Sequence, residues 1–109
     1  MQQLIKEILK FRDARDWKQF HTPENLAKSI SIEAAEVLEH FQWNNDCNAT
    51  EVGEELADVF MYLVMMADSI EVNLKDAVLS KLKQNEVRYP VKKAKGNSIK
   101  YSSFKADKS

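Results

Sequence analysis

The chain has 109 residues, of which 44% are hydrophobic and 30% charged, an ordinary size and composition for one globular domain. A single cysteine, Cys47, excludes an internal disulfide, and the longest apolar run, residues 59–67, is too short to span a membrane. Because the N-terminus has no signal-peptide pattern, we expect a soluble cytoplasmic protein that does not bind membranes.

Charge is distributed unevenly along the chain. Residues 92–109 hold six Lys and one Asp, whereas residues 1–91 carry 10 basic and 16 acidic side chains. An acidic body argues against nucleic-acid binding, which requires a basic surface. We therefore expect one folded domain over residues 1–91 and a solvated, Lys-rich tail over residues 92–109. The alternative is a tail that closes over a bound polyphosphate.

The first two predicted helices rest on apolar spacing and a capping signal. Apolar side chains recur at helical spacing in residues 1–17. Thr22 is a good N-cap for a second helix over residues 22–43, with Pro23 at its first position. The side chains expected to be buried on this second helix are Leu26, Ile30, Val37, Leu38 and Phe41.

A polar turn at residues 44–48 separates the second helix from a third, over about residues 50–70. Asn73 can cap a fourth helix, which has Asp76 in its first turn and stops before Pro90. Only two Gly and two Pro interrupt the chain, which favours long helices. The sequence therefore predicts an all-α fold, a bundle of four helices.

Residues 59–66 of the third helix are apolar around most of its circumference. A helix of this kind is buried on more than one side. A 109-residue monomer can hardly cover it, so we expect the chain to self-associate. A central helix in a monomeric bundle is the alternative.

Two pairs of acids stand out, Glu33 with Glu36 and Glu55 with Asp58. A spacing of three puts both acids of a pair on one helix face, with Cβ atoms roughly 5–6 Å apart. Their mutual repulsion costs stability unless a cation neutralises them. Hard oxygen ligands favour Mg²⁺, or Mn²⁺ as a substitute, and Mg²⁺ commonly joins carboxylates to substrate phosphates. The pattern predicts a magnesium enzyme that acts on a phosphorylated substrate.

Helix geometry is expected to bring the two pairs together. About seven residues separate Glu36 from the end of the second helix, a rise of roughly 10 Å. The return from Thr50 to the second pair climbs a similar ~7–12 Å. A short turn usually makes consecutive helices antiparallel neighbours. The two pairs should therefore face each other at the same height.

Four blocks of residues carry a resemblance to a known family. In chain order they are RDWKQFH at 15–21, EAAE leading to FQW at 33–43, EELADV at 54–59, and Asn85 leading to RYP at 88–90. Together they closely resemble the MazG-like all-α nucleoside triphosphate pyrophosphohydrolases, and within them the dCTP pyrophosphatase group. The similarity covers about residues 4–90.

The resemblance implies cleavage between the α and β phosphates of a nucleoside triphosphate, with Mg²⁺, giving a monophosphate and pyrophosphate. It also implies a homodimer or homotetramer with sites near subunit interfaces, and a catalytic role for residues 1–91. Carried over by position, the implied Mg²⁺ ligands and catalytic residues are Glu33, Glu36, Glu55 and Asp58. The residues that resemble the lining of the base and sugar pocket are Trp17, His21, Trp43 and Tyr62. The residues that fall where the family contacts phosphate or closes the pocket are Lys81, Asn85, Arg88 and Tyr89.

The chemistry of these residue types fits the implied roles. Lys81, Asn85 and Arg88 recur at helical spacing and can donate several hydrogen bonds to a polyphosphate. The plainer interpretation of this stripe is a solvent-exposed face. A tryptophan can stack on a base, although most tryptophans in such places seal helix ends. One of the four acids could accept a proton from water instead of binding metal, and Glu36 is our first candidate.

Other sites and functions fit less well. A di-iron bundle would need E-x-x-H pairs, but Val37 stands three residues before His40. A zinc hydrolase would need His or Cys ligands, which are scarce here. We therefore expect a Mg²⁺-dependent pyrophosphohydrolase that acts on dCTP or related deoxynucleotides and clears surplus or modified nucleotides. The remaining alternatives are an all-α dUTP-hydrolysing enzyme and a helical interaction module without catalytic activity.

Overall fold

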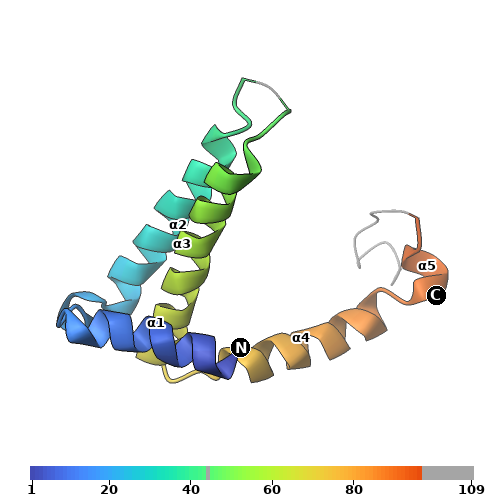
Figure 1. Cartoon of the computed structure of the whole chain (residues 1–109). Coiled ribbons are helices and arrows are strands. Elements are labelled where there is room, and N and C mark those ends of the chain that lie inside the picture. The colour runs from blue at the N-terminus through green and yellow to red at the C-terminus, as the bar shows by residue number, and fades with distance from the viewer. Residues whose placement is uncertain (44, 97–109) are drawn as a thin grey trace. The chain divides into compact units, whose positions relative to one another are not determined.

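The computed structural model describes residues 1–43 and 45–96 (Figure 1). Its elements in chain order are α1 (Gln2–Ala14), the 3₁₀ helix η1 (Lys18–Phe20), α2 (Pro23–Glu39), α3 (Ala49–Ser69), α4 (Leu74–Arg88) and the short α5 (Val91–Ala94). Over these described residues the secondary structure is helical and includes no strand. The all-α class and the four long helices are thereby confirmed. None of the described helices combines the length and the apolar character that crossing a membrane requires.

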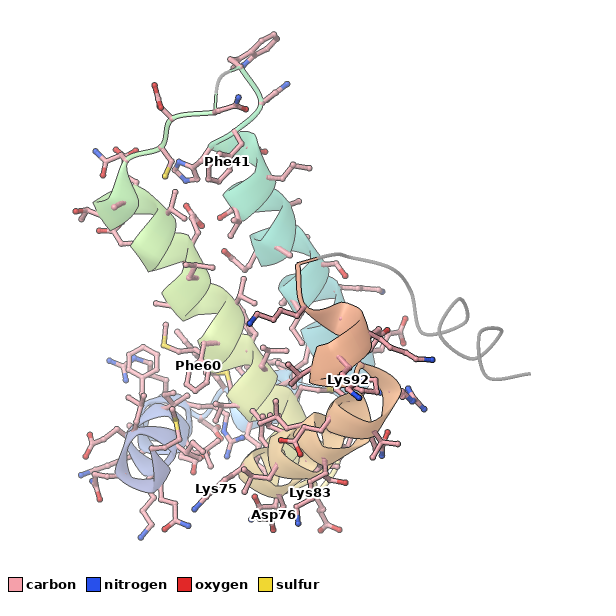
Figure 2. All side chains as sticks on the ribbon, turned by 90° about the vertical axis from the view of Figure 1, so that its right-hand side faces the viewer. Phe41, Phe60, Lys75, Asp76, Lys83 and Lys92 are labelled. Carbon is pink, nitrogen blue, oxygen red and sulfur yellow. The ribbon has the colours of Figure 1, made fainter. Side chains whose placement is uncertain are left out.

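The chain divides into two compact units, Met1–Val72 and a second unit that begins at Asn73. In the first unit α2 and α3 run antiparallel and form a long hairpin, and α1 packs against α3 near the end of the hairpin away from its loop (Figure 1). Figure 2 shows Phe41 at the loop end of this hairpin. The second unit holds α4 and α5.

Side-chain caps start the long helices α2, α3 and α4. Thr22 Oγ1 accepts the N–H of Asn25 at 3.2 Å, and Asn73 Oδ1 accepts the N–H of Asp76 at 3.0 Å. Both caps are confirmed as predicted. Asn48 caps α3 and accepts two backbone N–H groups at 3.0 and 3.1 Å, so α3 begins at Ala49. Each such cap is worth about 1 kcal/mol, because it satisfies N–H groups that have no partner inside the helix.

Two helices end earlier than the sequence predicts. The helix expected over residues 1–17 stops at Ala14, because Asp16 adopts a left-handed φ of 54°. The N–H of Trp17 then bonds back to the carbonyl of Arg12 at 3.2 Å, which is the Schellman pattern of helix ends. Glycine is the usual residue at this left-handed position, so Asp16 gives no stop signal in the sequence.

The second early end is that of α2, expected to reach residue 43 and observed to stop at Glu39. The N–H of Phe41 still donates to the carbonyl of Leu38 at 3.0 Å, and the N–H of Gln42 donates to the carbonyl of Glu39 at 3.3 Å. The last turn thus tightens from α-type to 3₁₀-type bonds, a common way to satisfy terminal carbonyls. Residues 45–48 are not helical and lie in the loop of the hairpin.

The small core of the first unit lies where α1, α2 and α3 meet. Its buried apolar side chains are Ile8, Leu26, Val64, Met65 and Ala67. Leu26, at 1% exposure, is the most completely buried. The predictions that Leu38 and Phe41 are buried are wrong, since their side chains are 70% and 39% exposed. Phe41 lies beyond the end of α2 at Glu39. Leu38 is twelve residues after Leu26 in the sequence, about 120° around the helix at 100° per residue, so it points away from the core.

Candidate functional site

Three of the four predicted acids converge between the helices of the hairpin. Glu33 comes from α2, and Glu55 and Asp58 come from successive turns of α3. One carboxylate oxygen from each lies within 4.8 Å of the other two. All three side chains are half-buried, since they lie between the packed helices. Oxygen atoms at this separation are compatible with a single small cation bound between them, at about 2.0–2.1 Å from each for Mg²⁺ after slight closure.

Glu36, the fourth predicted acid, lies next to this cluster. Its carboxyl group is within hydrogen-bonding reach of the carboxyl groups of Glu33 and Glu55. Glu36 is one turn from Glu33 on α2, so the pairing of acids along this helix is the expected i, i+3 arrangement. Which of the four acids binds metal and which accepts a proton stays a prediction.

Repulsion within the cluster appears in the acid–base properties of its members. Burial, the largest cause, and the neighbouring carboxyl groups of Glu36, Asp58 and Glu55 together raise the pKa of Glu33 to about 7. The pKa of Glu55 is raised mainly by the neighbouring Glu36, while His40 acts in the opposite direction. His40 Nε2 lies 3.7 Å from Glu55 Oε1.

A divalent cation fits this donor set. Glu33 Oε2 is buried and has no hydrogen-bond partner among residues 1–43 and 45–96. A buried acceptor without a donor costs about 1–3 kcal/mol, and more when it is charged. Three neighbouring acids add repulsion rather than donors. A hard cation such as Mg²⁺ or Mn²⁺ would satisfy the oxygen and offset the charge at the same time.

The raised pKa of Glu33 predicts how the metal-free protein responds to pH. The folded state holds this proton more tightly than the unfolded state, whose value is near 4.5. The protonated Glu33 therefore contributes to the free energy of unfolding. This contribution is complete below the unfolded-state pKa and is lost as pH rises through about 7. Urea unfolding in EDTA should show this loss in the wild type and a smaller loss in Glu33→Gln. Glu54→Gln, an exposed acid on α3, is the control. An unchanged pH response in Glu33→Gln would contradict the assignment.

A pocket of about 190 Å³ adjoins the acids in the first unit. It is lined by Phe11, Trp17, His21, Asp58, Met61, Tyr62 and Met65. Its aromatic rings contact one another edge to face, with centroid distances of 5.6 Å for Phe11–Trp17 and 6.4 Å for both Trp17–His21 and His21–Tyr62. Flat apolar walls of this kind suit a planar ring. Asp58 belongs to both the pocket and the acid cluster.

Local structure holds the segment that carries Trp17 and His21. Gln19 Nε2 donates to the carbonyl of Asp16 at 3.1 Å, and Asn25 Nδ2 donates to the carbonyl of Phe20 at 3.1 Å. The second bond ties the segment to the first turn of α2. The first bond holds the start of the segment and the second holds its end, so Trp17 and His21 lie in a segment that side-chain-to-backbone bonds fix on both sides.

His21 presents an unsatisfied ring atom in this pocket. Its Nδ1 is buried and has no hydrogen-bond partner within the described residues. Burial lowers the pKa of His21, and the positive charge of Arg12 lowers it further. The ring is therefore neutral near pH 7 and offers one donor and one acceptor nitrogen.

The structure does not bring all the predicted pocket residues together. Trp43 lies in the hairpin loop, is 86% exposed and does not line the pocket described here. The predicted phosphate contacts all belong to the second unit: Lys81, Asn85 and Arg88 on α4, and Tyr89 just after it. Within that unit the N–H of Tyr89 bonds to the carbonyl of Asn85 at 2.8 Å. The roles of Trp43 and of these four residues remain predictions.

Four neighbours of the site were not singled out in the sequence. Met61 and Met65 follow Asp58 and Tyr62 by three residues each, so helical spacing along α3 could have identified them. His40 follows Glu36 by four residues and shares its helix face. Phe11 gives no such signal, because it reaches the pocket from a different helix.

Comparisons with known proteins agree with this geometry. The MazG-like family model matches residues 28–104. The chain is 41% identical to dCTP pyrophosphatase 1 of Mus musculus and 41% identical to that of Homo sapiens. Each of these matches covers 84% of this chain but 60% of the relative, so the chain spans about three fifths of the length of these curated relatives.

A solved structure is similar over nearly its whole length. The crystal structure of a pyrophosphatase from Archaeoglobus fulgidus matches with a TM-score of 0.75 and 44% sequence identity, covering 83% of this chain and 92% of that one. The resemblance seen in the sequence, including its closeness to the dCTP pyrophosphatases, is confirmed by these matches. The chain belongs to the MazG-like family.

Proposed function

We propose that this chain hydrolyses a nucleoside triphosphate between its α and β phosphates and releases a nucleoside monophosphate and pyrophosphate. We also propose that it favours deoxynucleotides, with dCTP first among them, and that it removes surplus or modified nucleotides from the cellular pool. The names of two relatives, dCTP pyrophosphatase 1 and a pyrophosphatase, support the reaction class and the base.

One observation carries the proposal: Asp58 lies in both the acid cluster and the aromatic pocket. A nucleotide has a flat base at one end and a polyphosphate at the other. An aromatic pocket beside a cluster of acids, joined through one residue, matches both ends. An interaction module without catalytic activity would have no need to leave a carboxylate oxygen such as Glu33 Oε2 buried, with no hydrogen-bond partner in the described part of the chain.

In this proposal Glu33, Glu55 and Asp58 hold Mg²⁺, with Glu36 beside them. When bound, Mg²⁺ would supply positive charge that offsets the charge of the phosphates and makes a water more reactive. Glu36 is the candidate acceptor for a proton from that water, because it contacts two of the other acids without belonging to their close group.

The pocket side chains are proposed to bind and orient the base. Trp17 and Tyr62 offer ring faces and edges, and His21 offers one donor and one acceptor nitrogen for the base edge. On the second unit, the proposed donors to the phosphates are Lys81, Asn85, Arg88 and Tyr89. Arg88 suits this role because a guanidinium can donate two parallel hydrogen bonds to one phosphate.

A substrate panel tests the proposal. The purified protein is incubated with each common NTP and dNTP, with Mg²⁺ and with EDTA, and the products are separated by chromatography. We expect monophosphate and pyrophosphate only with the metal, and the fastest turnover with dCTP. Fastest turnover of dUTP would favour the alternative substrate. Failure to turn over any nucleotide under these conditions would contradict the proposed activity.

Trp17→Ala should weaken substrate binding through the pocket. Loss of one base–aromatic contact is worth roughly 1–3 kcal/mol, so KM for dCTP should rise about 5- to 150-fold. Phe20→Ala is the matched control, because Phe20 is an exposed aromatic of the same segment and lies outside the pocket lining. Steady-state kinetics on both variants gives the comparison. Equal effects of the two substitutions on KM would argue against base binding at this pocket.

We further propose that a second copy of the chain covers the exposed apolar face of α3. Leu56 and Leu63 lie seven residues apart on one face of this helix, and both side chains are exposed. Isolated exposed leucines are ordinary, but a stripe along a helix is typical of an interface. Light scattering after size exclusion should give the mass of a dimer or tetramer. A monomer at micromolar concentration would contradict this expectation.

A further inference from the structure

The most deeply buried charge among the described residues belongs to Arg12, which is 3% exposed and lies outside the acid cluster. Burying a guanidinium costs several kcal/mol unless it is paired and hydrogen-bonded. The position of Arg12, two residues before the end of α1, therefore calls for an explanation in terms of its partners.

The side chain of Arg12 joins α1 to α3. Its Nη1 donates to Asp68 Oδ2 at 2.8 Å, and Asp68 lies near the C-terminal end of α3. Its Nε donates to Asp13 Oδ1 at 2.9 Å. Asp13 is the next residue on the same helix and is largely exposed, so this second bond fixes no distance between helices. The bond to Asp68 is the one that connects the two elements.

The backbone of Arg12 holds the pocket segment. Its carbonyl accepts the N–H of Trp17 at 3.2 Å, which closes the Schellman end of α1. One residue thus bonds to α3 through its side chain and to Trp17 through its carbonyl. The opposite wall of the pocket, Tyr62 and Asp58, is carried by α3 itself. The separation of the two walls therefore depends on where Arg12 sits against α3.

We infer that Arg12 and Asp68 are positioning residues, a clamp between α1 and α3 that sets the distance between Trp17 and the α3 wall of the base pocket. The expected effect of the clamp on substrate binding rests on the proposed function. The clamp itself is a property of the free protein. It acts on binding of the base and leaves the acid cluster, which lies on α2 and α3, in place.

The first test measures the free protein and needs no activity. In a Trp43→Phe background, Trp17 is the only tryptophan, so its fluorescence reports on the pocket alone. Asp68→Ala should make Trp17 more accessible to acrylamide quenching at unchanged helical circular dichroism. Asp13→Ala is the matched control, because it removes the other carboxylate on Arg12 and leaves the link between the helices intact. Its quenching should equal that of the parent.

The second test separates binding from chemistry, with Trp43 restored. Asp68→Ala should raise KM for dCTP roughly 10-fold, equivalent to ~1.4 kcal/mol, with kcat unchanged. Asp68→Asn, which keeps the side-chain shape, should lie between the parent and Asp68→Ala on both readouts. It also replaces Asp68→Ala in both tests if the alanine variant loses helical structure.

The outcomes distinguish the clamp from the proposed activity. The clamp would be overturned if folded variants of Asp68 and of Asp13 showed the same acrylamide quenching of Trp17 and the same KM for dCTP. A fall in kcat with KM unchanged would overturn it as well, because the clamp would then act on the acids. If the wild type hydrolyses no nucleotide, the proposed activity fails, and the quenching comparison alone still decides whether Arg12 and Asp68 position Trp17.

Discussion

Glu33→Gln is expected to lower the rate of pyrophosphate release by about 10²–10³-fold while the helices stay intact. The substitution keeps the shape of the side chain and removes the charge that faces Glu55 and Asp58. The site would then hold a divalent cation less tightly and offset the phosphate charge less well. Pyrophosphate release at saturating dCTP and Mg²⁺ gives the rate, and circular dichroism gives the helical content.

The remaining acids supply parallel tests and a control. Glu36→Gln, Glu55→Gln and Asp58→Asn should each lower the rate as well, and without metal each should leave stability unchanged or raise it, because a repelling charge is lost. Glu54→Gln changes an exposed acid one residue from Glu55 and should keep the wild-type rate. If all four cluster variants retained full activity, the proposed site would be wrong.

Leu26→Ala should lower the free energy of unfolding by about 2–5 kcal/mol. Leu26 is 1% exposed at the meeting point of three helices, so truncation leaves a cavity that the neighbouring helices can close only in part. Domains of this size are stable by about 5–15 kcal/mol in total, which makes this a large fraction. Urea denaturation followed by circular dichroism measures the change.

The control for Leu26→Ala is the same substitution at another leucine of α2. Leu38 is 70% exposed, so Leu38→Ala should change the free energy of unfolding by at most about 0.5 kcal/mol. A Leu38→Ala variant as unstable as Leu26→Ala would mean that the side chain is covered in solution. A Leu26→Ala variant as stable as the wild type would contradict the core described above.

Much of the fold could be predicted because its signals are local. Thr22 and Asn73 precede helices as side-chain caps, and both cap as expected. The end of α1 was harder to predict, since Asp16 adopts a left-handed φ of 54° where glycine is usual. A side chain that tolerates this strain leaves no mark in the sequence. Leu38 shows a second difficulty: an apolar residue assigned to the predicted buried stripe need not face the core.

In the site too, features set by local spacing could be predicted, and features set by long-range packing could not. Convergence of Glu33 with Glu55 and Asp58 depends only on helix rise and on a short connection, both of which can be read from spacing. The pocket depends instead on how α1 packs against α3, which brings Phe11 to Tyr62 from a distant part of the chain. No short-range pattern encodes that packing. The partly buried hydrogen bond from Arg12 to Asp68, 56 positions apart, also depends on this long-range packing.

The proposed reaction of these acids and this pocket is the cleavage of a nucleoside triphosphate between its α and β phosphates. A ³¹P NMR time course of dCTP with Mg²⁺ and the wild-type protein tests it most directly, because the products have distinct resonances. We expect the three dCTP signals to give way to those of dCMP and pyrophosphate with the wild type, and to persist with Glu33→Gln. Appearance of dCDP and inorganic phosphate, or an unchanged dCTP spectrum with the wild type, would contradict it.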